Sequence, residues 1–138
     1  HVHTLVATAL VSGTNVISDR LDASILAYQV YGEERPDLQE LFWNARKALF
    51  SETLPDLYIF LDVPANEGFV RLKKAGKKLD HFERRSLSFH ERVREGYKEF
   101  FKHVPHIIVD ATRPLAKVQQ EALALVQNQL TNTWQRSM

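Results

Sequence analysis

An acid, a cation and two hydroxyl-bearing side chains stand close together in the segment VISDRLDASILAYQ. Asp19 and Arg20 directly follow a short apolar run, and Arg20, Ser24 and Tyr28 are each four residues apart. In a helix this spacing places the three on one face, drifting about 40° per step. Arg can bond two phosphate oxygens at once, and Tyr can stack on a base while donating a hydrogen bond. The pattern predicts a phosphate-and-base wall with Gln29 beside it, although a surface helix with an Arg–Asp pair explains the spacing equally well.

A second group of charges lies in RLKKAGKKLDHFERR. The simplest interpretation is a solvated helix end, because cations are favoured at the C-terminus of a helix. A second interpretation is a mobile lid that brings positive charge over a transferring phosphoryl group. A nucleic-acid patch is disfavoured by the interleaved Asp80 and Glu83 and by the lack of aromatics beyond Phe82. The cations of this run are Arg71, Lys73, Lys74, Lys77, Lys78, His81, Arg84 and Arg85.

Three aspartates end apolar runs in the same way, in VISD, IFLD and IIVD. They are Asp19, Asp62 and Asp110. Ligands of open parallel sheets bind in the crevice outside the carboxyl ends of the strands. Asp is also a favoured helix cap, and capping is the simpler interpretation of Asp62 and Asp110.

The composition excludes several classes of function. The chain has 138 residues, 44% hydrophobic and 25% charged, with net charge +1 and no cysteine. It therefore has no overall field that attracts nucleic acid or membrane, no disulfide and no thiolate metal site. No apolar run approaches the roughly 20 residues of a membrane helix, and the histidines lack metal-ligand spacing. We expect a cytoplasmic protein with no nucleic-acid or membrane partner.

The elements that must position these groups alternate between strands and helices. Short strands are predicted at 16–17, 57–63 and 106–111, and the continuously apolar second strand is typical of a strand covered on both faces. The helix from Pro36 to Phe50 is predicted to bury one face, while Trp43 and Phe50 lie off it and serve either a dimer interface or extra core packing. The order predicts a parallel α/β sheet flanked by helices. The remaining helices are predicted at 2–11, 22–31, from Pro64 to Gly76, around Val93 to Val104 and from Pro114 onward, and the buried face of the 36–50 helix is Leu38, Leu41, Phe42, Ala45 and Leu49.

Four segments resemble, in order, the thymidylate kinase family of P-loop nucleoside monophosphate kinases. The resemblance starts at VISDRLDASILAYQ and continues through LPDLYIFLDVPANEGFVRL, LDHFERRSLSFHERVREGY and IIVDATRPLAKV. It implies a three-layer α/β fold and transfer of a phosphoryl group from ATP to thymidine monophosphate (dTMP), with Mg²⁺, in a homodimer. It also implies that residues 1–138 are part of a single nucleotide-kinase domain, with a lid at about 73–86.

The resemblance implies roles for individual residues. Asp19 helps to organise Mg²⁺ and Arg20 contacts the dTMP phosphate, both as catalytic residues, while Ser24, Tyr28 and Gln29 line the dTMP pocket. The basic lid supplies charge to ATP, and the loop at Asp110 and Ala111 lies near adenine. The lid residues so implicated are Lys73 and Lys77, as catalytic cations, with Arg71, Lys74 and Lys78.

One motif of this family is absent from the 138 residues. The sequence contains no G-x-x-x-x-G-K-[ST] segment, whose backbone N–H groups cradle ATP phosphates. The P-loop strand is also the central strand of the sheet, so we expect an incomplete fold, the C-terminal two-thirds of a kinase domain, inactive by itself. The alternatives are another nucleoside or nucleotide kinase, or a non-catalytic module that binds a nucleotide or a polyanion.

Overall fold

A computed structural model describes residues 2–51, 53–76, 81 and 83–137. The chain divides into two compact units, which we describe separately. The first unit contains His1–Asp56 and Ser88–His103, and the second contains Leu57–Leu87 and Val104–Met138.

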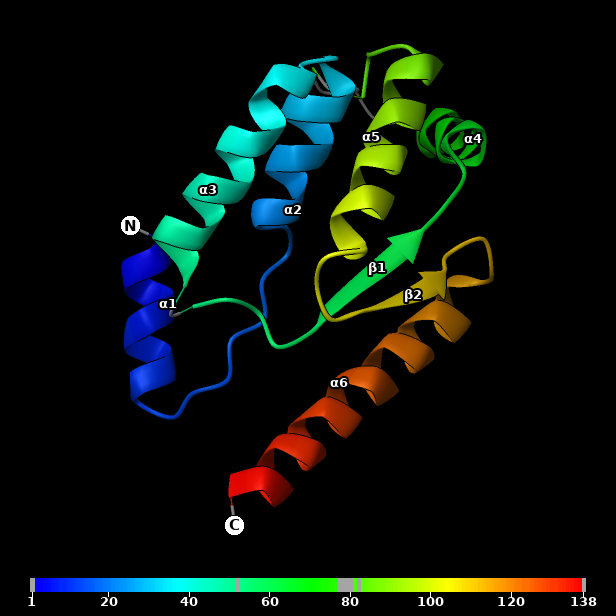
Figure 1. The fold of residues 1–138 in the computed structure, drawn as a ribbon. Helices are drawn as coiled ribbons and strands as arrows, with labels where there is room; N and C mark the ends of the chain where they lie inside the picture. The colour runs from blue at the N-terminus through cyan, green and yellow to red at the C-terminus, as the bar shows by residue number, and fades with distance from the viewer. Residues whose placement is uncertain (1, 52, 77–80, 82, 138) are drawn as a thin grey trace. The chain divides into compact units, whose positions relative to one another are not determined.

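The first unit is helical. Figure 1 shows α2, α3 and α5 side by side, and apolar side chains between them form its core. A π-helix continues α2 directly, so the predicted helix at 22–31 exists but changes its winding after Ile25. The elements are α1 (Val2–Val11), α2 (Asp22–Ile25), the π-helix η1 (Leu26–Gly32), the 3₁₀ turn η2 (Pro36–Leu38), α3 (Gln39–Phe50) and α5 (Leu87–Phe101). Its buried apolar residues are Ala23, Leu26, Ala27, Val30, Phe42, Phe89, Val93, Phe100 and Phe101.

Two glycines allow the π-helix and α5 to approach closely. A Cβ atom on Gly96 would lie 2.7 Å from the Ala27 Cα, and one on Gly32 would lie 2.8 Å from the Phe89 ring. Real Cβ atoms do not approach other heavy atoms so closely, and a backbone atom cannot yield as a flexible side chain can. Gly96 therefore lets α5 lie directly against the helix that carries Tyr28.

Helix α3 packs through only part of its predicted apolar face, on which Phe42 is buried and Leu38 and Ala45 are half-buried. Trp43 stacks on Phe100 with 5.6 Å between ring centroids and 10° between planes, and the Phe42 ring lies 6.2 Å from Phe100. Trp43 therefore serves core packing. The prediction that Leu41 and Leu49 face inward was wrong, since they are 63% and 62% exposed. The aromatic contacts with α5 turn this side of the helix outward.

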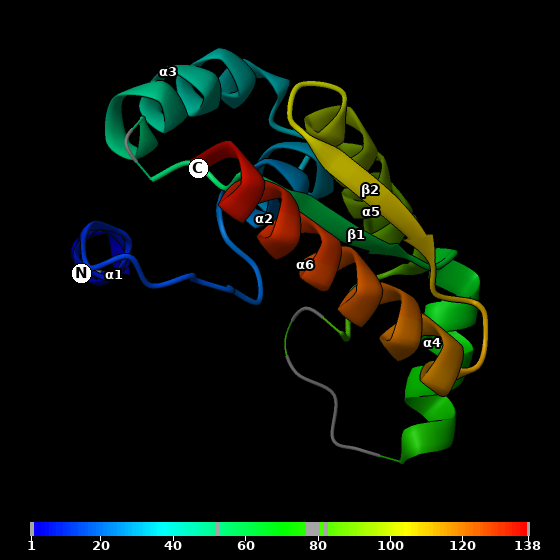
Figure 2. The ribbon, with the colours of Figure 1, turned by 90° about the horizontal axis from the view of Figure 1, so that it is seen from below.

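The second unit contains a parallel two-stranded sheet. Strands β1 (Tyr58–Asp62) and β2 (His106–Asp110) pair in parallel from Tyr58 opposite His106 to Asp62 opposite Asp110. The strand predictions at 57–63 and 106–111 are thus confirmed. Figure 2 shows α6 running back alongside the strands, and Val118 on α6 and Val109 on β2 are both buried. The helices of this unit are α4 (Ala65–Ala75) and α6 (Leu115–Ser137).

Two strand expectations were wrong. Residues 14–18 form no strand, and Ile17 is 80% exposed. A strand needs a neighbour for its backbone groups, and within the described ranges only β1 and β2 pair. Strand β1 is also not covered on both faces, since Leu61 is 50% exposed. No described helix is both long and apolar enough to span a membrane.

Candidate functional site

The backbone at Arg20 leaves the helical region just before α2. Arg20 has a φ of 64°, the left-handed conformation, and α2 begins two residues later at Asp22. Arg20 is therefore not in one continuous helix with Ser24 and Tyr28, and the helix begins at Asp22 as predicted. The Ser18 hydroxyl donates a 2.8 Å hydrogen bond to the Arg20 carbonyl and bridges this bend. A non-glycine residue in this conformation costs about 1–3 kcal/mol, and such strain concentrates at functional sites.

The bend nevertheless brings the predicted wall together. The Arg20 guanidinium carbon lies 5.3 Å from the centroid of the Tyr28 ring, in cation–π geometry. Ser24 Oγ lies 2.8 Å from the Tyr97 hydroxyl, and the Tyr28 and Tyr97 rings meet edge to face at 6.3 Å. We call these four residues the Arg20 cluster: Arg20, Ser24, Tyr28 and Tyr97. A cation, aromatic faces and hydroxyl groups thus meet on one part of the first unit.

The electrostatics keep the cluster in a form that suits an anion. Partial burial lowers the pKa of Arg20, but Tyr28, Tyr97 and nearby Asp19 outweigh it, so the net pKa shift is upward. Burial raises the pKa of Tyr97, against the opposing effects of its hydrogen bond to Ser24 and of the Arg20 charge. Near pH 7 the guanidinium is therefore cationic and the Tyr97 phenol is neutral. The cluster can bond a phosphate through its guanidinium and contact a ring through its tyrosines.

Two further predicted residues lie beside the cluster. Asp19 precedes Arg20 in the bend and is exposed, and its charge acts on both Arg20 and Tyr97. Gln29 follows Tyr28 in the π-helix, and its side chain is exposed. Asp19 therefore offers one carboxylate next to the cation. The described residues contain no group of three or more acidic, His or Cys side chains placed to hold a metal ion.

A buried ion pair fixes the start of α2. Asp22 is 1% exposed, its Oδ2 accepts a 2.6 Å hydrogen bond from Arg46 Nε, and its Oδ1 accepts one from the Ala23 amide. The Arg46 guanidinium also lies over the Phe100 ring, at 5.3 Å. Helix α2 is thereby joined to α3 two residues after Arg20.

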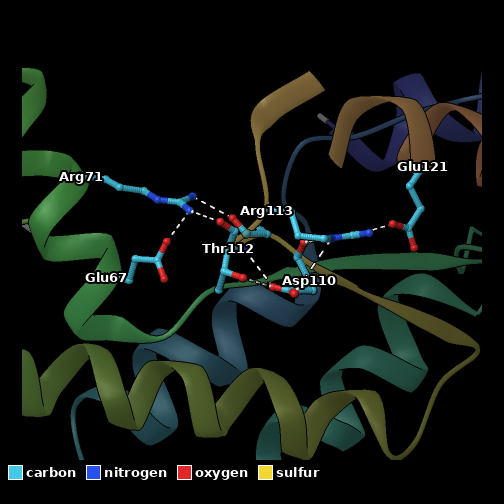
Figure 3. A network of polar contacts seen from close by, with 7 residues as sticks. Glu67, Arg71, Asp110, Thr112, Arg113 and Glu121 are labelled. Atoms are coloured by element: carbon cyan, nitrogen blue, oxygen red, sulfur yellow. Dashed lines mark hydrogen bonds and ion pairs between the residues drawn. The ribbon is translucent and has the colours of Figure 1, made fainter. Parts of the chain in front are cut away.

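In the second unit the loop after β2 forms a polar network, shown in Figure 3. We call residues 110–113 the Asp110 loop. Arg71 of α4 donates to the carbonyl of Ala111 at 2.8 Å and to that of Thr112 at 3.0 Å. Asp110 accepts hydrogen bonds from Thr112, which lower the pKa of its carboxyl group. The structure thus joins three of the residues predicted for the ATP side: Arg71, Asp110 and Ala111.

The predicted lid cations are only partly described. Lys73 and Lys74 are exposed in the last turn of α4, which ends at Gly76 with a φ of 61°. This ending confirms the predicted helix stop, and lysines there also suit the helix dipole. Lys77 and Lys78 lie outside the described residues.

Sequence reasoning missed two contributors to these sites. Tyr97 lies in the helix predicted around Val93 to Val104, and no sequence spacing connects it with Ser24, 73 residues earlier. Arg113 donates through Nε to the Asp110 carbonyl at 3.0 Å and pairs with Glu121. Glu121 lies eight residues after Arg113. This is not the three- or four-residue spacing that indicates a contact between adjacent turns of a helix, so the sequence does not predict the pair.

Comparison with known proteins assigns the chain to a family. The family model for thymidylate kinase matches residues 1–122. The thymidylate kinase of Rhodopseudomonas palustris is 34% identical over 94% of this chain and 57% of its own length. That of Leuconostoc citreum is 36% identical over 96% of this chain and 62% of its own length. The chain thus spans about three-fifths of these relatives.

A solved structure supports the fold. A deoxyadenosine kinase from M. mycoides, solved with bound dCTP, superposes with a TM-score of 0.56 and 19% identity, over 95% of this chain and 70% of that one. The two-stranded parallel sheet and its helices are therefore part of an α/β nucleoside-kinase fold, which confirms the predicted fold class. The chain belongs to the thymidylate kinase family.

Proposed function

We propose that the protein containing this chain transfers the terminal phosphoryl group of ATP to dTMP, giving ADP and dTDP for dTTP synthesis. The observation that supports this best is the Arg20 cluster. It presents one cation and two aromatic rings within contact distance, matching a ligand with a phosphate at one end and a base at the other. Membership of the thymidylate kinase family supports the same reaction.

On the acceptor side, each residue of the wall has a distinct task. Arg20 bonds the dTMP phosphate through its planar fork and offsets its charge. Tyr28 supports the guanidinium and, with Ser24 and Gln29, lines the pocket for the sugar and base. The hydrogen bond between the Tyr97 and Ser24 hydroxyl groups holds Ser24 in place. Positioning and neutralisation of charge are the main contributions that a protein makes to phosphoryl transfer.

Asp19 fits a role in binding Mg²⁺. The ion is usually held by one or two carboxylates together with substrate phosphates and water, so a single exposed carboxylate beside Arg20 suffices. When bound, Mg²⁺ neutralises charge on the phosphates. The same carboxylate favours the cationic form of Arg20.

The ATP side is assigned to the second unit. The Asp110 loop lies at the carboxyl end of β2, next to that of β1, where parallel sheets bind ligands. We place adenine against Asp110 and Ala111 and the ATP phosphates near the lid cations. Lys73 and Lys77 act there as catalytic cations and Lys74 and Lys78 add positive charge, while Arg71 contributes to the ATP side through its contact with the Asp110 loop.

An assay of the full-length protein tests this function. With ATP and Mg²⁺ we expect dTMP to be phosphorylated with a kcat/KM at least about a hundredfold above that of AMP or deoxythymidine, because deoxythymidine leaves Arg20 without a phosphate. The readout is ADP release, with dTDP identified by chromatography and dUMP as a further comparison. Preference for AMP or deoxythymidine would assign the protein to a different nucleotide or nucleoside kinase, and absence of all turnover would favour a binding module.

We also propose that the protein containing this chain is a cytoplasmic homodimer. Leu41 and Leu49 leave an apolar strip of α3 exposed, as a helical interface requires. The lack of cysteine agrees with a reducing compartment. Sedimentation at micromolar concentration is expected to give twice the monomer mass, and Leu41→Glu with Leu49→Glu to give the monomer. A monomeric wild type would contradict the proposal.

A further inference from the structure

The Asp110 loop is held from both sides by arginines. Arg71 of α4 donates hydrogen bonds from its two terminal nitrogens, one to the Ala111 carbonyl and the other to the Thr112 carbonyl. From the loop itself, Arg113 donates to the Asp110 carbonyl. Figure 3 shows Arg71 reaching the loop from α4, while the Arg113 side chain runs from the loop toward Glu121 on the other side. Three successive carbonyls are therefore bonded to guanidinium groups.

The amides of the same loop are bonded as well. The Ala111 amide donates to the Asp62 carbonyl at 2.9 Å, which joins the loop to the end of β1. The Thr112 amide and hydroxyl both donate to Asp110 Oδ1, at 2.9 and 2.6 Å. Within the part of the chain that the structure describes, the Arg71 hydrogen bonds join this loop to α4.

Arg71 is suited to this task by its shape. A guanidinium is a rigid fork, so it can hold two neighbouring carbonyls at once, whereas the ammonium of a lysine is a single flexible point charge. Glu67, one turn earlier on α4, pairs with the same guanidinium and orients it. The Arg71 side chain is 47% exposed, and exposed ion pairs contribute little to stability. Its defined geometry therefore points to a role in the shape of the loop and not in holding the fold together.

We propose that Arg71 is a positioning residue that fixes the Asp110 loop for the base of ATP. This inference rests on the proposed function, which places adenine at this loop. It assigns the Arg71 donors to the two carbonyls and not to the phosphates of ATP. Loss of the fork should let the loop open, so that the affinity for ATP falls while the dTMP side is unaffected.

The test compares Arg71→Ala and Arg71→Lys with Lys117→Ala, which removes an exposed cation from α6 in the same unit. In the full-length protein, both Arg71 variants are expected to raise KM for ATP about tenfold, the effect of one lost charge-assisted hydrogen bond. KM for dTMP is expected to stay within about twofold. Amide exchange at Ala111 and Thr112 should accelerate at least about tenfold, while Lys117→Ala should match the wild type.

Each result bears on the proposal. If Arg71→Lys restores KM for ATP, a charge on the phosphates is the role of Arg71 and the positioning role is overturned. Unchanged amide exchange, or faster exchange with unchanged KM for ATP, overturns it too. Amide exchange can be measured without turnover. If the wild-type protein fails to phosphorylate dTMP, the proposed function is refuted, but the exchange rates at Ala111 and Thr112 still show whether Arg71 fixes the loop.

Discussion

Replacing Arg20 with alanine in the full-length protein is expected to lower kcat/KM for dTMP at least about a hundredfold. Two charge-assisted hydrogen bonds to a phosphate contribute about 1.5–3 kcal/mol each, and about 2.7 kcal/mol corresponds to a hundredfold change in rate. Arg20 suits this task because its guanidinium is cationic near neutral pH and the bend at residue 20 brings it over the Tyr28 ring. Initial rates at varied dTMP and saturating ATP measure the effect.

Arg20→Lys is the matched control, because it keeps the positive charge and removes the planar fork. We expect it to recover only part of the lost rate. The thermal midpoint of Arg20→Ala should stay close to that of the wild type, since the side chain is exposed. If Arg20→Ala leaves the kinetics for dTMP unchanged, the assignment of the phosphate to this residue is wrong.

The second large effect is expected on stability, from Arg46→Met. The substitution leaves the 1% exposed Asp22 carboxylate without its cation, and breaking a buried pair in this way costs about 3–5 kcal/mol. The methionine fills much of the same space against Trp43 and Phe100, so loss of packing is a minor part of the change. Urea denaturation of the full-length protein measures the free energy of unfolding.

Arg35→Ala removes a comparable but exposed pair, since the Arg35 and Asp37 side chains are 54% and 58% exposed. We expect it to leave the urea midpoint almost unchanged, because water replaces the lost partner. Adding Asp22→Asn to Arg46→Met should restore part of the stability by removing the uncompensated charge. If Arg46→Met and Arg35→Ala change the free energy of unfolding equally, burial of the Asp22–Arg46 pair does not increase its contribution to stability.

Local pattern was enough to predict much of the fold. The runs LYIFLD and HIIVD are short, apolar and bounded by turn residues, and both form the strands they predict. Gly76 marks a helix end because glycine adopts the left-handed conformation without a steric penalty, and Pro36 marks the start of η2, which leads into α3, because its φ is fixed near the helical value. The proximity of Arg20, Ser24 and Tyr28 was also predictable, because all three lie within nine residues of one another.

What escaped prediction depends on partners distant in sequence. Residues 16–17 are apolar like the true strands, yet strand formation also needs a neighbour, which a local pattern does not supply. Tyr97 lies 73 residues from its partner Ser24, and Arg71 lies 40 from Ala111. The left-handed bend at Arg20 also has no signal, since neither glycine nor asparagine marks it. Such pairings are set by how helices pack, and a single sequence does not reveal that packing.

The π-helix from Leu26 to Gly32 makes the length of this segment as important as its composition. Its wide turns close through bonds such as Glu33 amide to Tyr28 carbonyl, which span five residues where an α-helix spans four. Deleting one residue would let the segment rewind as an ordinary helix and rotate its two ends relative to each other by about 100°. Tyr28 could then no longer face Arg20 while Gly32 faces Phe89 of α5. Conservative substitutions should therefore be tolerated in this segment far better than a deletion.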